Sequence, residues 1–164
     1  MGIMDKFERM VCLIERIQVA AGILSIAGIG IIIPLQVFCR YILNAPLIWP
    51  EDIGIGLMVW SGFLGAAVLY KRKSHVAIEF IVSHFPKKMS PLISLAIDLM
   101  IAFLSLLIMI YCFRLNQLQM MTMQVGTGIP RGYFYSLPLL LNTIVMFVYS
   151  LYAILKNPVI RRSP

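Results

Sequence analysis

The chain has 164 residues, of which 60% are hydrophobic and only 13% are charged, and its formal net charge is +7. A soluble domain has about 25% charged residues, so this composition excludes a water-soluble fold and predicts that a bilayer surrounds most of the chain. The basic residues flank apolar runs instead of forming one face, which argues against nucleic acid as a partner and is typical of membrane proteins.

The three cysteines, Cys12, Cys39 and Cys112, have no CxxC spacing, so the sequence predicts neither a metal site nor a disulfide framework. All three lie in apolar surroundings, and we interpret them as buried thiols. Cys39 and Cys112 should both lie near the outer face of the membrane, so a disulfide between them is an alternative. The first apolar run has no small-residue cleavage pattern, and we expect no cleaved signal peptide.

The chain begins with a segment, residues 3–16, in which apolar side chains recur at helical spacing among charged ones. This pattern predicts an amphipathic helix at the cytoplasmic interface of the membrane, or else an extension of the first span. Residues 17–38 form an apolar run long enough to cross the hydrocarbon core, which takes about 20 residues. Pro34 removes one backbone hydrogen bond from this span, and we expect a kink there.

A short loop, residues 39–51, connects the first span to the second. Trp49 suits the belt of aromatic side chains at a membrane interface. Glu51 and Asp52 fall in the first turn of the next helix, where the helix dipole favours anions. Capping alone explains these acids, but pairing with Arg40 or with a partner protein is an alternative interpretation.

The second span, residues 53–70, contains no charged residue, and its small residues predict a face that packs closely against another helix. The glycines assigned to this packing are Gly54, Gly62 and Gly65. A basic cluster, residues 71–73, follows the span. The next segment, residues 74–85, is too short to cross the membrane, and His75 and Glu79 lie on one narrow polar stripe of it. It predicts a helix that lies in the membrane plane or packs under a partner.

The third span, residues 92–113, contains one charged residue, Asp98. At 1.5 Å per residue this carboxyl group lies about 10 Å into the membrane. An acid at such a depth is costly and is by default a candidate functional group. Because a basic loop is close, we expect a structural pairing of Asp98 with Lys71, Arg72 or His75, and coupling-ion binding is the alternative.

A glycine-rich turn within residues 114–132 leads to the fourth span, residues 133–155. Every lysine and arginine except Arg40, Arg114 and Arg131 lies before the first span, between the second and third, or after the fourth. This distribution predicts an all-α integral membrane protein with four spans and both termini in the cytoplasm. The spans carry no histidine, carboxylate cluster or hydrolase motif, so we expect no enzyme, no membrane haem and no autonomous pump. A structural or interaction subunit remains.

Two stretches carry a family resemblance. Residues 40–51 read RYILNAPLIWPE, and Trp60, FLGAA at residues 63–67 and KRKSHV at residues 71–76 follow them. Together with GTGIPRGYFYSLP at residues 126–138, this order and spacing resembles the small, DctQ-like membrane subunit of tripartite ATP-independent periplasmic (TRAP) transporters. The likeness covers residues 17–155. Glu51 is the matched acid, and the resemblance assigns no role to Asp52.

The resemblance implies a scaffold subunit in the bacterial inner membrane, packed on a large multi-span subunit in an elevator-type transporter. A periplasmic substrate-binding protein would deliver an organic acid, such as a dicarboxylate or sialic acid, for sodium symport. We expect no cofactor on this chain, because Na⁺ would bind the large subunit. Membrane lipid is the other expected partner. The alternatives are an anchor or assembly subunit of another complex, and a self-sufficient small transporter.

Two sets of side chains follow from these arguments. The periplasmic face that the binding protein touches is predicted to include Arg40, Asn44, Trp49, Glu51 and Arg131. Structural polar contacts on the cytoplasmic side are assigned to Lys71, Arg72, His75, Glu79 and Asp98.

Overall fold

A computed structural model describes residues 3–72 and 90–157, and in this part of the chain it is helical. The elements are α1 (Ile3–Tyr41), α2 (Trp49–Lys71), α4 (Ser90–Met120), the one-turn α5 (Arg131–Phe134) and α6 (Ser136–Lys156). The four longer helices are each long and apolar enough to cross a membrane. The all-α architecture with four spans is therefore confirmed, whereas the predicted helix at residues 74–85 lies outside the described residues.

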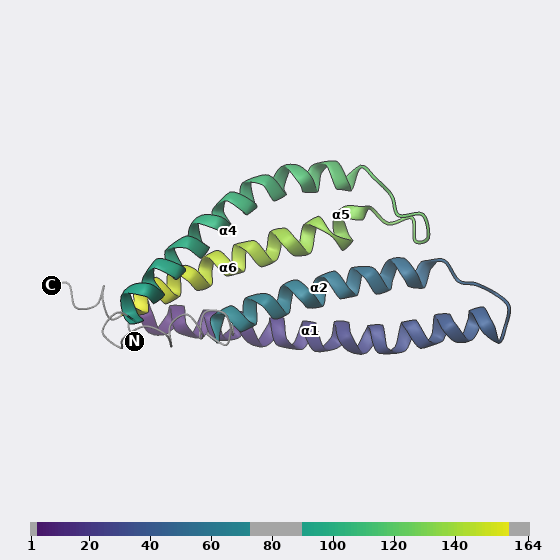
Figure 1. Ribbon diagram of the computed structural model, residues 1–164, viewed down its shortest axis with the longest axis horizontal. Helices are drawn as coiled ribbons and strands as arrows, with labels where there is room; N and C mark the ends of the chain where they lie inside the picture. The colour runs from purple at the N-terminus through teal and green to yellow at the C-terminus, as the bar shows by residue number, and fades with distance from the viewer. Residues whose placement is uncertain (1–2, 73–89, 158–164) are drawn as a thin grey trace.

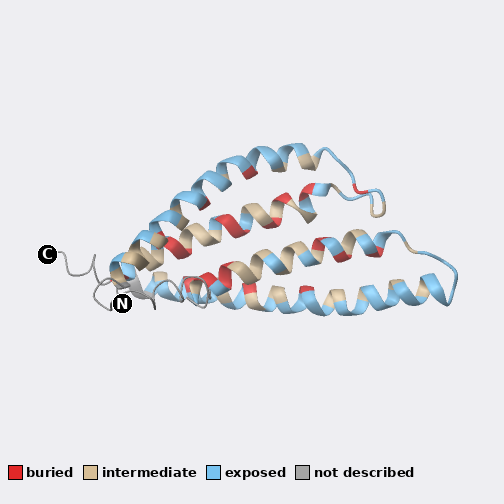
Figure 2. Ribbon diagram, viewed as in Figure 1, coloured by how far each residue is buried: buried red, intermediate tan, exposed pale blue. Residues whose placement is uncertain are grey.

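The helices form two hairpins, α1 with α2 and α4 with α6, which contact each other mainly through α2 and α6 (Figure 1). The hairpins converge at the end where α1 begins and α6 ends, and they diverge toward the end that carries the two loops. Buried residues gather on α2 and α6, while α1 and α4 are mostly exposed (Figure 2). In the most apolar window of α1 only 6% of residues are buried, against 28% in α2. Most of the apolar surface therefore needs lipid or another protein to cover it.

The positions of helix-breaking residues explain where the helices continue and where they end. One uninterrupted helix covers the two segments expected at residues 3–16 and 17–38, because no helix breaker separates them, and it continues through Pro34. The fourth span begins with two helices that meet at Tyr135. Pro138 explains this break, because its ring would clash with the carbonyl of Phe134 in a continuous helix.

A polar network ties the hairpins together at the convergent end. Glu15 on α1 accepts hydrogen bonds from Lys71 Nζ and Arg72 Nε, each at 2.6 Å, and Lys71 also bonds the Val11 carbonyl at 3.0 Å. The Tyr149 hydroxyl on α6 donates to Gln18 Oε1 on α1 at 2.7 Å. Because these groups lie around the small buried core, they join α1 to both of its neighbours.

A second group of contacts joins the first turns of α1 to the last turns of α6, also at the convergent end. Glu8 on α1 accepts hydrogen bonds from the Tyr152 hydroxyl at 2.6 Å and from Lys156 Nζ at 2.8 Å, both on α6. The Asn157 amide donates to the Pro91 carbonyl at the start of α4, at 3.1 Å. The beginnings of α1 and α4 and the ends of α2 and α6 thus share one end of the molecule.

The glycines of α2 differ in what surrounds them. A Cβ on Gly54 would lie 3.0 Å from Ile33, and one on Gly56 would lie only 2.1 Å from the Phe134 ring. A Cβ on Gly62 or Gly65 would meet nothing within 4 Å. Gly54 thus packs against α1 and Gly56 lets α5 approach, while the other two glycines have no packing role inside the described chain.

Alanine at Gly56 is expected to destabilise the chain, because the new methyl group overlaps an aromatic ring that cannot bend away. Overpacking of this kind costs about 1–3 kcal/mol in unfolding free energy. Gly62→Ala on the same helix is the matched control, and it should be neutral or stabilising by about 0.5–1 kcal/mol through helix propensity. Unfolding of the purified chain in mixed micelles measures both. Equal stability of the two variants would contradict the packing of α5 on Gly56.

Candidate functional site

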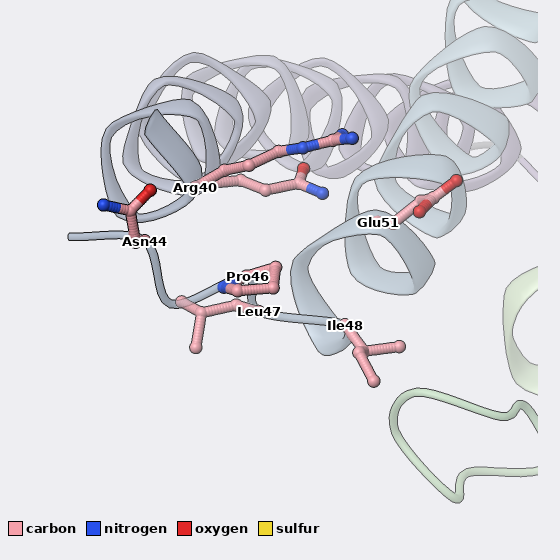
Figure 3. Close-up of a pocket in the computed structure, with 7 residues that line it drawn as sticks. Arg40, Asn44, Pro46, Leu47, Ile48 and Glu51 are labelled. Atoms are coloured by element: carbon pink, nitrogen blue, oxygen red, sulfur yellow. The ribbon is translucent and has the colours of Figure 1, made fainter. Parts of the chain in front are cut away.

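An open pocket of about 440 Å³ lies where α1 passes into α2 (Figure 3). It is the feature that brings charged side chains together at the divergent end of the molecule. Its lining residues are Gln36 and Arg40 from α1, Asn44, Pro46, Leu47 and Ile48 from the loop, and Glu51 from α2.

Local backbone chemistry shapes this pocket. The α1 helix ends with a hydrogen bond from the Ala45 N–H to the Cys39 carbonyl at 3.1 Å. Asn44 adopts a left-handed conformation with φ of 48°, which asparagine tolerates better than most residues. Pro46 then prevents a further helical turn, and Pro50 fits the first turn of α2, where its missing N–H costs nothing. The chain therefore reverses within a short loop, and Arg40 and Glu51 come to the same pocket.

The charges of the pocket are exposed and of both signs. Arg40, Asn44 and Glu51 all have exposed side chains. Arg40 extends from the end of α1 toward α2, whose first turn carries Glu51 (Figure 3). No salt bridge joins these two residues among those found in residues 3–72 and 90–157. Such a pair of unneutralised charges suits recognition of a polar protein surface.

Asp52 links this pocket to the second loop. Its Oδ2 accepts hydrogen bonds from the backbone N–H groups of Gly126, at 2.9 Å, and Thr127, at 3.1 Å. A Cβ on Gly126 would lie 2.8 Å from that oxygen and 2.9 Å from the Ile48 carbonyl. Only glycine fits there without a shift, so the two loops form one connected surface. We call this contact the Asp52 clasp.

The second loop has its own internal structure. The Gln124 N–H donates to the Ile129 carbonyl at 2.9 Å, and the Arg131 N–H donates to the Thr122 carbonyl at 2.8 Å. Gly128 has a φ of 67°, which favours glycine at this turn. The tip exposes apolar side chains: Val125 is 90% exposed. Apolar groups beside a charged pocket are typical of protein–protein interfaces.

The structure brings together only part of the predicted outer site. Arg40, Asn44 and Glu51 line the pocket, whereas Trp49 and Arg131 do not. Both of these are exposed, at the first residues of α2 and α5. Sequence reasoning gave Asp52 only the role of a first-turn acid, although a Gly-Thr-Gly turn elsewhere in the chain was a visible signal for such a clasp.

The structure shows partners for three of the residues predicted to make polar contacts on the cytoplasmic side. Asp98, which is 4% exposed, accepts a hydrogen bond at 2.8 Å from the Tyr70 hydroxyl, a partner that the sequence did not name. Lys71 and Arg72 bind Glu15, because that carboxylate lies beside the end of α2. His75 and Glu79 lie outside the described residues.

The cysteines and possible metal ligands add no further chemistry. Cys12, Cys39 and Cys112 are free thiols, and only Cys112 is buried, so two of the three predicted buried thiols are wrong for the chain by itself. No group of three or more His, Cys, Asp or Glu side chains suited to a metal ion occurs in the described part of the chain.

Comparison with known proteins gives consistent matches. The family described as "Tripartite ATP-independent periplasmic transporters, DctQ component" matches residues 29–157. The chain is 34% identical over 80 residues to the sialic acid TRAP transporter permease protein SiaT of Haemophilus influenzae, covering 49% of the chain and 13% of SiaT. It is 27% identical over 101 residues to the sialic acid TRAP transporter small permease protein SiaQ of Vibrio cholerae, covering 60% of the chain and 58% of SiaQ.

A third relative is a protein of Haemophilus influenzae described as a TRAP transporter small permease protein, at 26% identity over 110 residues. This alignment covers 67% of the chain and 68% of that relative. The chain thus spans less than two thirds of the length of SiaT and of SiaQ, and slightly more than two thirds of the third relative.

Removal of the Asp52 carboxylate should release the second loop. In Asp52→Ala the N–H groups of Gly126 and Thr127 lose a charged acceptor, a change worth about 1.5–3 kcal/mol per hydrogen bond. Their hydrogen exchange, followed by mass spectrometry, should become about 10- to 100-fold faster. Glu51→Ala, one residue earlier and with an exposed side chain, is the control and should leave this exchange unchanged. Unaltered exchange in Asp52→Ala would show that the clasp does not hold the loop.

Proposed function

Because the chain belongs to the DctQ component family of the tripartite ATP-independent periplasmic transporters, we propose that it is the small membrane subunit of a sodium-driven importer of an organic acid. The observation that carries this proposal is the family match over residues 29–157, which includes all four apolar helices in part or whole. The four helices also make it a multi-pass membrane protein, as in a bacterial inner membrane.

The substrate class of the proposal comes from the relatives. Both SiaT and SiaQ are named as sialic acid TRAP transporter proteins. We assign this chain to the import of a carboxylate, with sialic acid as the first compound to test and a dicarboxylate as the second. We assign sodium and substrate binding to the large subunit, with which this chain forms the transporter.

The role of this chain is to act as a scaffold for the large subunit. Its helices α1 and α4 expose apolar faces over most of their length, as a subunit packed on another membrane protein would. The match to SiaT occupies only 13% of that permease protein, so a similar segment occurs there within a much longer chain. Both observations support close packing on a large permease, which would move as an elevator against this fixed subunit.

The orientation follows from charge. Lys71, Arg72 and Lys156 lie at the convergent end, where the positive-inside rule assigns the cytoplasm. The loops of the divergent end, and with them the Arg40–Glu51 pocket, then face the periplasm. We assign this pocket and the tip of the second loop to docking of the substrate-binding protein, with Trp49 and Arg131 on either side.

Asp98 is given a structural role in this proposal. Its hydrogen bond from Tyr70 crosses from α2 to α4 near the convergent end, so it supports the union of the hairpins. The Tyr70 hydroxyl and the Asp98 carboxyl group are both buried, and such a bonded pair avoids the cost of an unsatisfied polar group in the membrane.

Purification of the tagged chain from its native membrane in a gentle detergent tests the proposed function. A large multi-span protein should copurify, and a periplasmic binding protein should be retained transiently and be identified by mass spectrometry. The ligand of that binding protein then identifies the substrate. Recovery of the chain as a homo-oligomer alone would contradict the proposal.

Charge reversal in the pocket should weaken docking of the binding protein. Arg40→Glu and Glu51→Lys each place a like charge against a complementary partner surface, and we expect the docking affinity to fall by about 10-fold and uptake to fall with it. Assembly with the large subunit should not change. Arg9→Glu, an exposed reversal at the opposite end of α1, is the control. Normal docking and uptake in both pocket variants would remove this surface from the mechanism.

A further inference from the structure

A second pocket, of about 290 Å³, lies between α1, α2 and α6, away from the outer loops. Trp60, the central residue of α2, and Ile14, beside Glu15 on α1, both form part of its wall, so the pocket extends from the middle of α2 toward the convergent end. Its walls are almost entirely apolar. The exposed side chains Ile17, Leu141 and Ile144 surround its mouth, so it opens to whatever surrounds the chain.

One polar wall residue of this pocket is unusual. Asn142 is only 5% exposed, and its Oδ1 is buried without a hydrogen-bond partner among the described residues. The neighbouring buried polar groups are satisfied inside the chain. Gln18 binds the Tyr149 hydroxyl at 2.7 Å, and Thr143 donates to the Leu139 carbonyl at 2.7 Å. An amide without partners in an apolar environment carries a large energetic cost.

The surroundings limit what could satisfy this amide. Lipid tails have no hydrogen-bonding groups, and the hydrocarbon core holds no water to replace them. The pocket, at about 290 Å³, also has room for a side chain. A polar side chain on a neighbouring membrane helix fits both requirements, because such side chains bond across helices in membranes.

We propose that this pocket receives a hydrogen-bonding side chain, such as Ser, Thr, Asn, Gln or Tyr, from a membrane helix of the large subunit, and that the Asn142 amide turns toward the pocket to form a hydrogen bond with it. This inference rests on the proposed function, because it requires a large membrane partner. It assigns the mouth of the pocket, between α1 and α6, to the interface between the two subunits.

The test compares the complex with the chain expressed alone, because the proposal predicts effects that differ between them. Asn142→Leu should weaken association with the large subunit by about 5- to 30-fold, since the partner side chain loses its hydrogen bond. In the chain alone it removes an amide that has no partner, so the unfolding temperature should not fall. Association is measured from the fraction of chain retained by the tagged large subunit after detergent washes.

Two controls distinguish a contact between Asn142 and a partner from a structural role of Asn142 inside the chain. Thr143→Val removes an equally buried hydroxyl whose partner is on the same helix, and it should leave association unchanged. Gln18→Leu breaks the hydrogen bond to Tyr149 inside the chain, so it should lower the unfolding temperature of the chain alone, unlike Asn142→Leu.

A second pair of variants tests the mouth of the pocket without touching Asn142. Leu141→Trp should obstruct the pocket and weaken association, whereas Leu151→Trp, at an exposed leucine outside the pocket on the same helix, should not.

The outcomes are distinguishable. If the wild-type chain associates with the large subunit and Asn142→Leu associates equally well, the pocket inference is wrong and the proposed function stands. If Asn142→Leu destabilises the chain alone, or weakens only self-association, the amide serves the chain itself or a second copy, and the inference is again wrong. If the wild-type chain binds no large membrane protein, both the inference and the proposed function fail.

Discussion

Glu15 provides the interaction on which the arrangement of helices depends. It receives Lys71 and Arg72 at the end of α2, and one turn further along α1 Gln18 receives Tyr149 of α6. In a membrane, apolar side chains gain little by leaving lipid for one another, so polar contacts and close packing hold helices together. The three side chains of the ion-pair cluster lie at the membrane boundary, where charges cost less than at mid-depth. The hairpins are therefore fastened at this end.

At the opposite end of the molecule, a pair of hydrogen bonds to Asp52 joins the two loops. There the helices diverge, and the Asp52 clasp joins the two loops through backbone N–H groups, in addition to the packing of α5 on Gly56 of α2. A carboxylate suits this task because one oxygen accepts two bonds and its charge strengthens both. The loops can thus present one surface, while the exposed apolar faces of α1 and α4 are left for lipid or another subunit to cover.

The sequence predicted most of the fold and part of the outer site. Span length and the distribution of basic residues indicated four helices, because both reflect simple requirements of the bilayer. Arg40, Asn44 and Glu51, which were assigned to one outer face, line one pocket, since a short loop leaves them little freedom to separate, and their contact with a binding protein stays a prediction. Asp98 also meets a partner that the sequence did not name. Charge favoured Lys71, Arg72 or His75, and His75 lies outside the described residues, but helix rotation directs Tyr70 toward Asp98 and directs Lys71 toward Glu15.

Asn142 shows why a buried polar group without a partner cannot be recognised from the sequence alone. An asparagine in an apolar helix resembles any polar residue that bonds its own backbone, as Thr143 next to it does. Only the packing of α1, α2 and α6 shows that its amide lies on a pocket wall without a partner. The same reasoning applies to Gly62 and Gly65, which have open space beside them while Gly54 and Gly56 are packed. A buried group left without a partner inside the described chain is therefore the first place to look for a contact with another protein.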